Sequence, residues 1–275
     1  MTMTTEQQAR EEMVRLGASF FQRGYATGSA GNLSLLLADG TLLATPTGSC
    51  LGELQAERLS KVSLNGEWLS GDKPSKEISF HRALYLNNPE CKAVVHLHCT
   101  YLTALSCLQG LDVENAIKPF TPYVVMRVGK VPVVPYYRPG DLRLAEDLAK
   151  LAPTHRAFLL ANHGPVVTGK DLRAAADNTE EMEDAARLIF TLGDRPIRYL
   201  TDDEITELRR CRFRVQSKSL PDVRVKCDSA EKTIGKCPKC KNVPDCCVLP
   251  TGIRHRCTLP FAGPHRPECR DLEQH

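Results

Sequence analysis

The first 210 residues show a mixture of helical and strand-like hydrophobic patterns. Thr5 is a candidate helix N-cap, because Gln8 three residues later completes a capping box and apolar residues then recur at helical spacing. Asp39-Gly40 and Asn65-Gly66 each separate two short apolar runs. This arrangement is typical of β-hairpins, so the N-terminal part is predicted to combine one helix with hairpin strands.

Helices and strands are also predicted further along the chain. The predicted helices cover 75–87, 100–108, 141–151, 171–191 and a short segment opened by a capping box at Thr201 and Glu204, and the predicted strands cover 93–98, 131–134 and 157–161. Hairpins mixed with helices predict an α/β domain of three αβα layers. Its central sheet is expected to be mixed or largely antiparallel.

Composition excludes several classes of protein. Apolar residues make up 42% of the chain and charged residues 25%, which is typical of a soluble globular protein. No stretch approaches the ~18–20 continuous apolar residues of a membrane span, so no membrane partner is expected. The N-terminus lacks a basic segment followed by an apolar one, which argues against a secretory signal. We therefore expect a cytoplasmic protein.

The C-terminal segment differs from the rest in composition. Residues 211–275 hold eight of the 12 Cys, seven of the 18 Pro, and 13 Lys and Arg against 7 Asp and Glu. Cys237 and Cys240 have the spacing of a zinc-ribbon pair, but the remaining Cys do not supply a second pair. Basic charge alone is a weak sign of nucleic-acid binding, and aromatic residues are few. We predict a catalytic domain at 1–210 and a disordered or unrelated tail at 211–275, with no nucleic-acid partner.

Three histidines are candidate metal ligands. His96 and His98 occupy positions i and i+2 of a predicted strand, so their side chains point to the same face. A pair alone is often only hydrogen-bonded, but His163 directly follows another buried strand. Catalytic zinc typically takes three protein ligands and leaves one position open. Glu77, at the start of the preceding helix, is a candidate oxygen ligand or general base.

Three donor-rich turns are candidate anion sites. They are the Ser29–Ser34 turn, the Thr45–Ser49 turn and the helix start at Ser75-Lys76. Backbone N–H groups of small residues and of helix N-termini bind phosphate well. Each turn alone is more often a plain cap, but the three together favour a phosphate pocket beside the metal.

These motifs, in this order, resemble the class II aldolase/adducin family. They read S-A-G-N-L-S, T-P-T-G-S, S-K-E-I-S-F-H-R-A-L-Y, A-V-V-H-L-H and A-N-H-G-P, and the resemblance covers residues 5 to about 210. It implies one Zn²⁺ per subunit, a homotetramer and an αβα fold. The implied site residues are His96, His98, His163 and Glu77 for the metal, Glu77 and Tyr123 for catalysis, and Asn32, Thr47, Gly48, Ser75 and Lys76 for the substrate phosphate.

Within the family, the sequence most resembles the bacterial 3-oxo-tetronate 4-phosphate decarboxylases. That resemblance implies loss of CO₂ through a metal-stabilised enediolate, giving dihydroxyacetone phosphate in sugar-acid catabolism. A sugar-phosphate aldolase or 4-epimerase uses the same chemistry and stays an alternative. The aldolase branch carries two consecutive serines where this chain has Ser75 and Lys76. A non-catalytic adducin-like scaffold is the third possibility, and it does not need the three histidines and Glu77.

Overall fold

The structure, a computed structural model, describes residues 5–217 of the chain. Within this range, one sheet is accompanied by helices and three single turns. The strands are β1 (Asn32–Leu36), β2 (Leu42–Ala44), β3 (Ser60–Val62), β4 (Trp68–Ser70), β5 (Ala93–His96), β6 (Val133–Val134), β7 (Ala157–Leu160) and β8 (Gly164–Gly169). The helices are α1 (Glu6–Gln22), α2 (Ile78–Asn87), α3 (Thr100–Ser106), α4 (Leu142–Leu151), α5 (Leu172–Leu192) and α6 (Asp202–Ser217). The single turns are the 3₁₀ segments η1 (Leu51–Glu53) and η2 (Ala56–Arg58) and the π-helical segment η3 (Val124–Val128).

The eight strands form one mixed sheet. Their order is β4-β3-β2-β1-β5-β8-β7-β6, and every neighbouring pair is antiparallel except β6 and β7. This confirms the predicted mixed, largely antiparallel sheet. The register places Asn32 of β1 opposite His96 of β5, and His96 opposite Val166 of β8. Asn32 and His96 therefore lie side by side at one end of the central strands.

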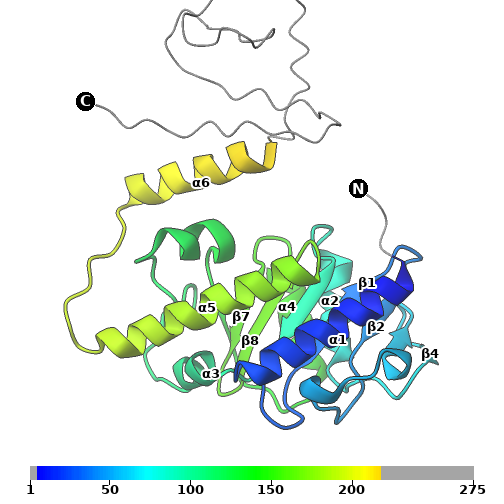
Figure 1. Cartoon of the computed structure of the whole chain (residues 1–275). Coiled ribbons are helices and arrows are strands. Elements are labelled where there is room, and N and C mark those ends of the chain that lie inside the picture. Colours follow the sequence, from blue (N-terminus) through cyan, green and yellow to red (C-terminus); the bar gives the residue numbers. More distant parts are fainter. Residues whose placement is uncertain (1–4, 218–275) are drawn as a thin grey trace, which may run out of the picture. The chain divides into compact units, whose positions relative to one another are not determined.

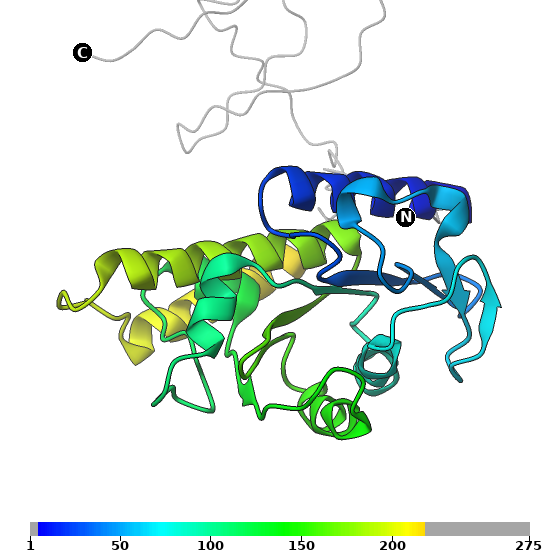
Figure 2. The same ribbon diagram turned by 90° about the horizontal axis from the view of Figure 1, so that it is seen from below.

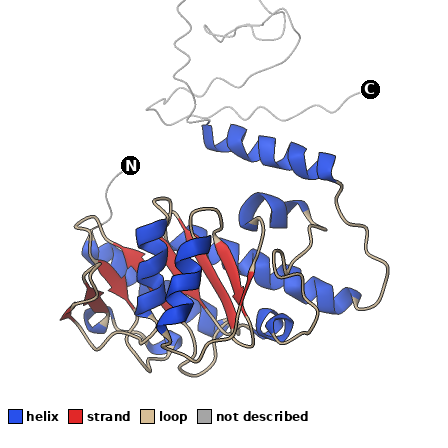
Figure 3. Ribbon diagram, turned by 180° about the vertical axis from the view of Figure 1, so that it is seen from behind, coloured by secondary structure: helices blue, strands red, loops and turns tan. Residues whose placement is uncertain are grey.

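Helices cover both faces of the sheet, which confirms the three-layer αβα prediction. Figures 1 and 2 show α1 and α5 on one face and α2 and α4 on the other. In Figure 3, α2 and α4 lie side by side in front of the strands. Successive strand residues point to opposite faces. Val95 thus packs into the core with Met13 of α1 and Ala175 of α5, while its neighbour Val94 packs into the second core with Leu84 of α2.

Several boundaries differ from the predicted ones. The strand predicted at 93–98 ends at His96, and the helix predicted from residue 75 begins at Ile78. Strand β8 and segment η3 were not predicted. The β8 sequence carries glycine at both ends and a proline, residue types that are depleted in strands. Its strand conformation comes from pairing with β5 and β7, which the local pattern does not encode.

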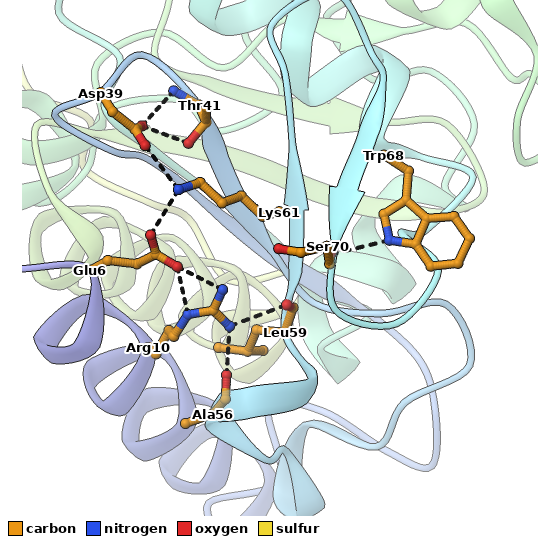
Figure 4. Close-up of polar contacts among 9 residues, drawn as sticks. All are labelled: Glu6, Arg10, Asp39, Thr41, Ala56, Leu59, Lys61, Trp68 and Ser70. Carbon is orange, nitrogen blue, oxygen red and sulfur yellow. Dashed lines mark hydrogen bonds and ion pairs between the residues drawn. The ribbon is translucent and has the colours of Figure 1, made fainter.

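A polar network holds α1 against the hairpin end of the sheet. The Lys61 Nζ of β3 lies 2.8 Å from a Glu6 oxygen and 2.9 Å from an Asp39 oxygen. Arg10 donates to Glu6 and to the carbonyls of Ala56 and Leu59 (Figure 4). The predicted capping box at the start of α1 is also present. Charge pairing therefore reinforces the apolar packing of this helix.

The C-terminal prediction is only partly covered by the structure. Helix α6, which opens with the predicted capping box, is longer than expected and runs through residue 210 to Ser217. The rest of the predicted tail, 218–275, lies outside the described residues, so its character stays a prediction. Among residues 5–217, no helix is long and apolar enough to cross a membrane.

Candidate metal centre and active site

The three predicted histidines form one cluster. One ring nitrogen from each of His96, His98 and His163 lies within 4.8 Å of the others. The Nε2 atoms of His96 and His98 are 3.2 Å apart. Two ligands of a tetrahedral zinc, each bonded at about 2.0–2.1 Å, lie about 3.3 Å apart. The spacing of this pair therefore fits shared ligation of one ion.

The sheet and helix α3 bring the histidines together. His96 is the last residue of β5, and His98 lies two residues beyond the end of that strand. His163 lies in the turn between β7 and β8, where its N–H donates to Ser106 Oγ and its carbonyl accepts from Thr103 Oγ1. Hydrogen bonds with α3 thus fix this turn.

Gly164 allows the turn to lie close to the β5 end. Its φ of +150° is a conformation that other residues rarely adopt. A Cβ at this position would lie 2.6 Å from the Leu97 carbonyl oxygen. A glycine is therefore needed for His163 to reach His96 and His98.

The imidazoles are in the form that binds metals. Burial lowers the pKa of all three rings, and that of His163 falls to about 4 because burial and the neighbouring His96 both disfavour its charged form. His96 Nδ1 lies 2.7 Å from the Pro165 carbonyl oxygen and donates to it, which leaves a lone pair on Nε2. That lone pair faces His98 Nε2, so a proton or a metal ion must lie between them. The donor set therefore fits a divalent cation with imidazole ligands.

Glu77 faces the same cluster from the start of α2. Its two carboxylate oxygens lie 3.4 Å from His96 Nε2 and 3.6 Å from His163 Nε2. Burial alone would raise the pKa of Glu77, but the facing imidazoles and a hydrogen bond from Asn32 lower it overall. The structure thus places an ionised carboxylate beside the three histidines, where it can bind a cation or exchange a proton.

Asn32 is turned toward Glu77. Its Nδ2 lies 2.7 Å from Glu77 Oε2, and its Oδ1 lies 2.6 Å from His81 Nε2. The predicted phosphate role of Asn32 stays a prediction. The sequence alone did not assign a role to His81.

The other two predicted anion segments lie side by side. An isolated β-bridge joins Pro46 to Pro74, and the Thr47 N–H donates to the Lys73 carbonyl. Thr47 and Gly48 line a cleft of about 470 Å³ together with two cations, Arg58 and Lys73. Two carboxylates, Glu53 and Asp72, line the same cleft, and Asp72 pairs with Arg58 at 2.6 Å. The predicted phosphate role of Thr47 and Gly48 therefore stays a prediction.

The remaining predicted site residues are Ser75, Lys76 and Tyr123. Ser75 Oγ accepts the Glu77 N–H, and Lys76 is exposed. Tyr123 precedes η3, and 56% of its surface is exposed. Among the described residues, no hydrogen bond links the Tyr123 side chain to the histidine cluster.

Comparison with known proteins identifies the family of the chain. The profile described as "Class II Aldolase and Adducin N-terminal domain" matches residues 11–190. The chain belongs to this family. Its relatives include 3-oxo-tetronate 4-phosphate decarboxylases from Pectobacterium atrosepticum, 81% identical over 207 residues, and Haemophilus influenzae, 62% identical over 204 residues. These matches cover 75% and 74% of this chain and 95% and 97% of the relatives.

Solved structures of the class II aldolase family have the same fold. The crystal structure of YgbL from Klebsiella pneumoniae is 77% identical, with a TM-score of 0.74 over 74% of this chain and 99% of that one. An L-fuculose 1-phosphate aldolase is 25% identical, with a TM-score of 0.69 over 76% of this chain and 97% of that one. The αβα domain of this chain is therefore the common framework of the family.

Proposed function

We propose that the protein is a 3-oxo-tetronate 4-phosphate decarboxylase that releases CO₂ and dihydroxyacetone phosphate. The observation that carries the proposal is that relatives 62–81% identical over almost their whole length bear this name. The cluster of His96, His98, His163 and Glu77 supports it, since it supplies a cation site with a carboxylate beside it.

The reaction breaks the C1–C2 bond of a 3-oxo acid. Carbon C1 leaves as CO₂, and its bonding electrons pass through C2 into the neighbouring C3 carbonyl to give an enediolate. A bound divalent ion acts as a Lewis acid for the negative charge that develops on the substrate oxygens. A proton then adds to C2, which completes dihydroxyacetone phosphate.

Residues of this chain supply the proton and hold the substrate. In this proposal Glu77 delivers the proton to C2, and Tyr123 is the second candidate donor. A positioned acid typically contributes about 10²–10⁴-fold to the rate. Thr47, Gly48, Ser75 and Lys76 hold the phosphate, which is remote from the breaking bond and fixes the orientation of the substrate.

Metal, assembly and location are part of the same proposal. Zinc is favoured because three neutral imidazoles are the ligands of many catalytic zinc sites. A homotetramer is proposed from the family resemblance. A phosphorylated sugar-acid substrate implies a metabolic enzyme of the cytoplasm.

Aldol cleavage is the second candidate. An L-fuculose phosphate aldolase from Methanococcus maripaludis is 36% identical over 184 residues, 66% of this chain and 97% of that protein. The same metal and carboxylate serve both reactions. The lower identity and the Lys76 position favour decarboxylation.

A substrate panel tests the proposal. The metal-loaded protein is incubated with 3-oxo-tetronate 4-phosphates of both configurations, L-fuculose 1-phosphate and L-ribulose 5-phosphate, and CO₂ and triose phosphate are followed. We expect equal amounts of CO₂ and dihydroxyacetone phosphate from a tetronate, and none from Glu77→Gln or His96→Ala. Triose phosphate from L-fuculose 1-phosphate without CO₂ from any tetronate would contradict it.

A further inference from the structure

A row of buried side chains runs from Glu77 away from the histidine cluster. Asn32 Nδ2 bonds to Glu77 at 2.7 Å, and Asn32 Oδ1 meets His81 Nε2 at 2.6 Å. His81 Nδ1 and the Tyr85 hydroxyl then each lie 2.7 Å from Ser34 Oγ. All five residues are at most 8% exposed. These bonds are therefore largely shielded from water.

The directions of these hydrogen bonds follow from the orientation of the Asn32 carboxamide, whose Nδ2 faces Glu77 and whose Oδ1 faces His81. A carboxylate only accepts, so the Asn32 atom facing it is the NH₂ group and the carbonyl oxygen faces His81. His81 therefore donates from Nε2, and its Nδ1 is an acceptor. Ser34 must donate its single hydroxyl proton to Nδ1, which leaves Ser34 Oγ to accept from Tyr85.

The row exists because the periods of a strand and a helix match here. Asn32 and Ser34 are two residues apart on β1, which separates them by about 6.6 Å along the strand. Glu77, His81 and Tyr85 are each four residues apart at the start of α2 and along it, which separates neighbours by about 6.0 Å. The polar side chains of the two elements can therefore interdigitate.

Histidine is suited to the central position. Burial lowers the pKa of His81 to about 3, so the ring stays neutral near pH 7 with one donor and one acceptor nitrogen. A protonated ring would donate from both nitrogens, and the Ser34 hydroxyl would then have to accept from Nδ1 instead of donating to it. An apolar residue would leave both Asn32 Oδ1 and the Ser34 hydroxyl without this partner.

We propose that His81 is a positioning residue for the reaction: its Nε2–H fixes the orientation of the Asn32 carboxamide, which in turn holds Glu77 against the histidine cluster. The reversed carboxamide would present its oxygen to the carboxylate and repel it. The inference rests on the proposed function for its kinetic consequence. Its structural part, the tautomer of His81, is independent of any activity.

Three substitutions of His81 test the kinetic consequence. His81→Gln places an NH₂ donor near the position of Nε2, whereas His81→Asn is too short to reach Asn32 and His81→Leu has no donor. Leu84→Val is the matched control, because Leu84 is fully buried on the same helix and belongs to the apolar core. Each variant is measured for kcat, KM, metal content and thermal unfolding.

The expected result is a loss in kcat with little change in KM. We expect His81→Asn and His81→Leu to lose at least about tenfold in kcat per metal-loaded enzyme, since small misplacements of a catalytic group cost up to about 10²-fold. His81→Gln should regain most of this loss, and Leu84→Val should keep the wild-type kcat. A wild-type kcat in His81→Leu, or a loss in His81→Gln as large as in His81→Leu, would overturn the proposal.

Nitrogen NMR of the histidines separates failure of this inference from failure of the proposed function. In both metal-free and metal-loaded protein, the His81 ring should show a protonated Nε2 and an unprotonated Nδ1. A protonated Nδ1 would overturn the inference even if the enzyme is active. A wild type without decarboxylase activity would contradict the proposed function alone, and the nitrogen shifts would then decide the inference.

Discussion

Glu183 holds the start of helix α3, and its replacement should be among the more damaging single changes outside the metal centre. Its carboxylate is buried, with 8% of the residue exposed, and accepts the backbone N–H groups of Tyr101 and Leu102 at 2.9 and 2.8 Å. These are N–H groups of the first turn of α3, which have no partner within the helix. Since α3 begins two residues after His98, the same contact also supports the metal centre.

The expected magnitude follows from these two bonds. Glu183→Gln keeps the size of the side chain and one acceptor oxygen, but its NH₂ group would face an N–H group. One hydrogen bond to a charged group, about 1.5–3 kcal/mol, is lost, together with about 0.3–1 kcal/mol of favourable helix-dipole interaction. Relief of the buried charge offsets part of the loss. We expect a destabilisation of about 2 kcal/mol, or about 4–8 °C in Tm for a domain of this size.

Urea unfolding followed by circular dichroism measures the effect at a fixed protein concentration. Glu180→Gln is the matched control, because Glu180 lies one turn earlier on α5 and pairs with Arg23 in a more exposed position. Such exposed pairs contribute about 0–1 kcal/mol. Equal unfolding free energies for the two variants, or a change below about 0.5 kcal/mol in Glu183→Gln, would refute the reasoning.

Three further predictions concern Lys61, Gly164 and the C-terminal residues. Lys61→Met should lower the unfolding free energy by at most about 1 kcal/mol near pH 7, because the ion pairs of Lys61 with Glu6 and Asp39 are partly exposed. Hydrogen bonds from Lys61 lower the pKa of Glu6 and of Asp39 in the folded protein. The stabilisation by these ion pairs is therefore complete above the ordinary pKa values of 4.5 and 3.8, and it is lost as the pH falls through the lowered pKa values of the folded protein. A difference from wild type in denaturant titrations that grows in acid would contradict this sign. Gly164→Ala should lower the free energy of unfolding by about 1–3 kcal/mol and weaken zinc binding in calorimetric titrations, because of the positive φ and the nearby Leu97 carbonyl. Gly110→Ala is the control, since a Cβ there meets open space, and it should spare zinc binding. Equal zinc affinity in the two variants would refute the role given to Gly164. A chain ending at Ser217 should keep kcat and KM, because 207 residues of this chain match 95% of a relative's length, and loss of turnover in it would show that the tail takes part.

Local patterns predicted the elements whose signals lie within a few residues. The capping box of Thr5 and Gln8 and the hairpin turn at Asp39-Gly40 are present in the structure. Both depend on hydrogen bonds or turn geometry between near neighbours, which a short sequence window contains.

Contacts between distant segments were harder to predict. His98 lies outside β5, so the argument from alternating strand positions does not explain its place, yet its ring still meets His96. The partners of His81 lie 47 and 49 residues away in sequence, and their contact depends on how α2 packs on β1. Spacing alone therefore indicated the chemistry of the cluster but not the row of side chains that supports it.

Metal content tests the central claim most directly, namely that His96, His98 and His163 bind one divalent cation. Wild type, His163→Ala and His155→Ala are loaded with zinc, dialysed and analysed by mass spectrometry. His155 is the control because it lies after α4 and its Nδ1 contacts Thr154 and the Leu151 carbonyl. We expect His163→Ala to hold one equivalent of zinc per chain less than wild type, and His155→Ala to match wild type. Equal zinc in all three proteins would contradict the account.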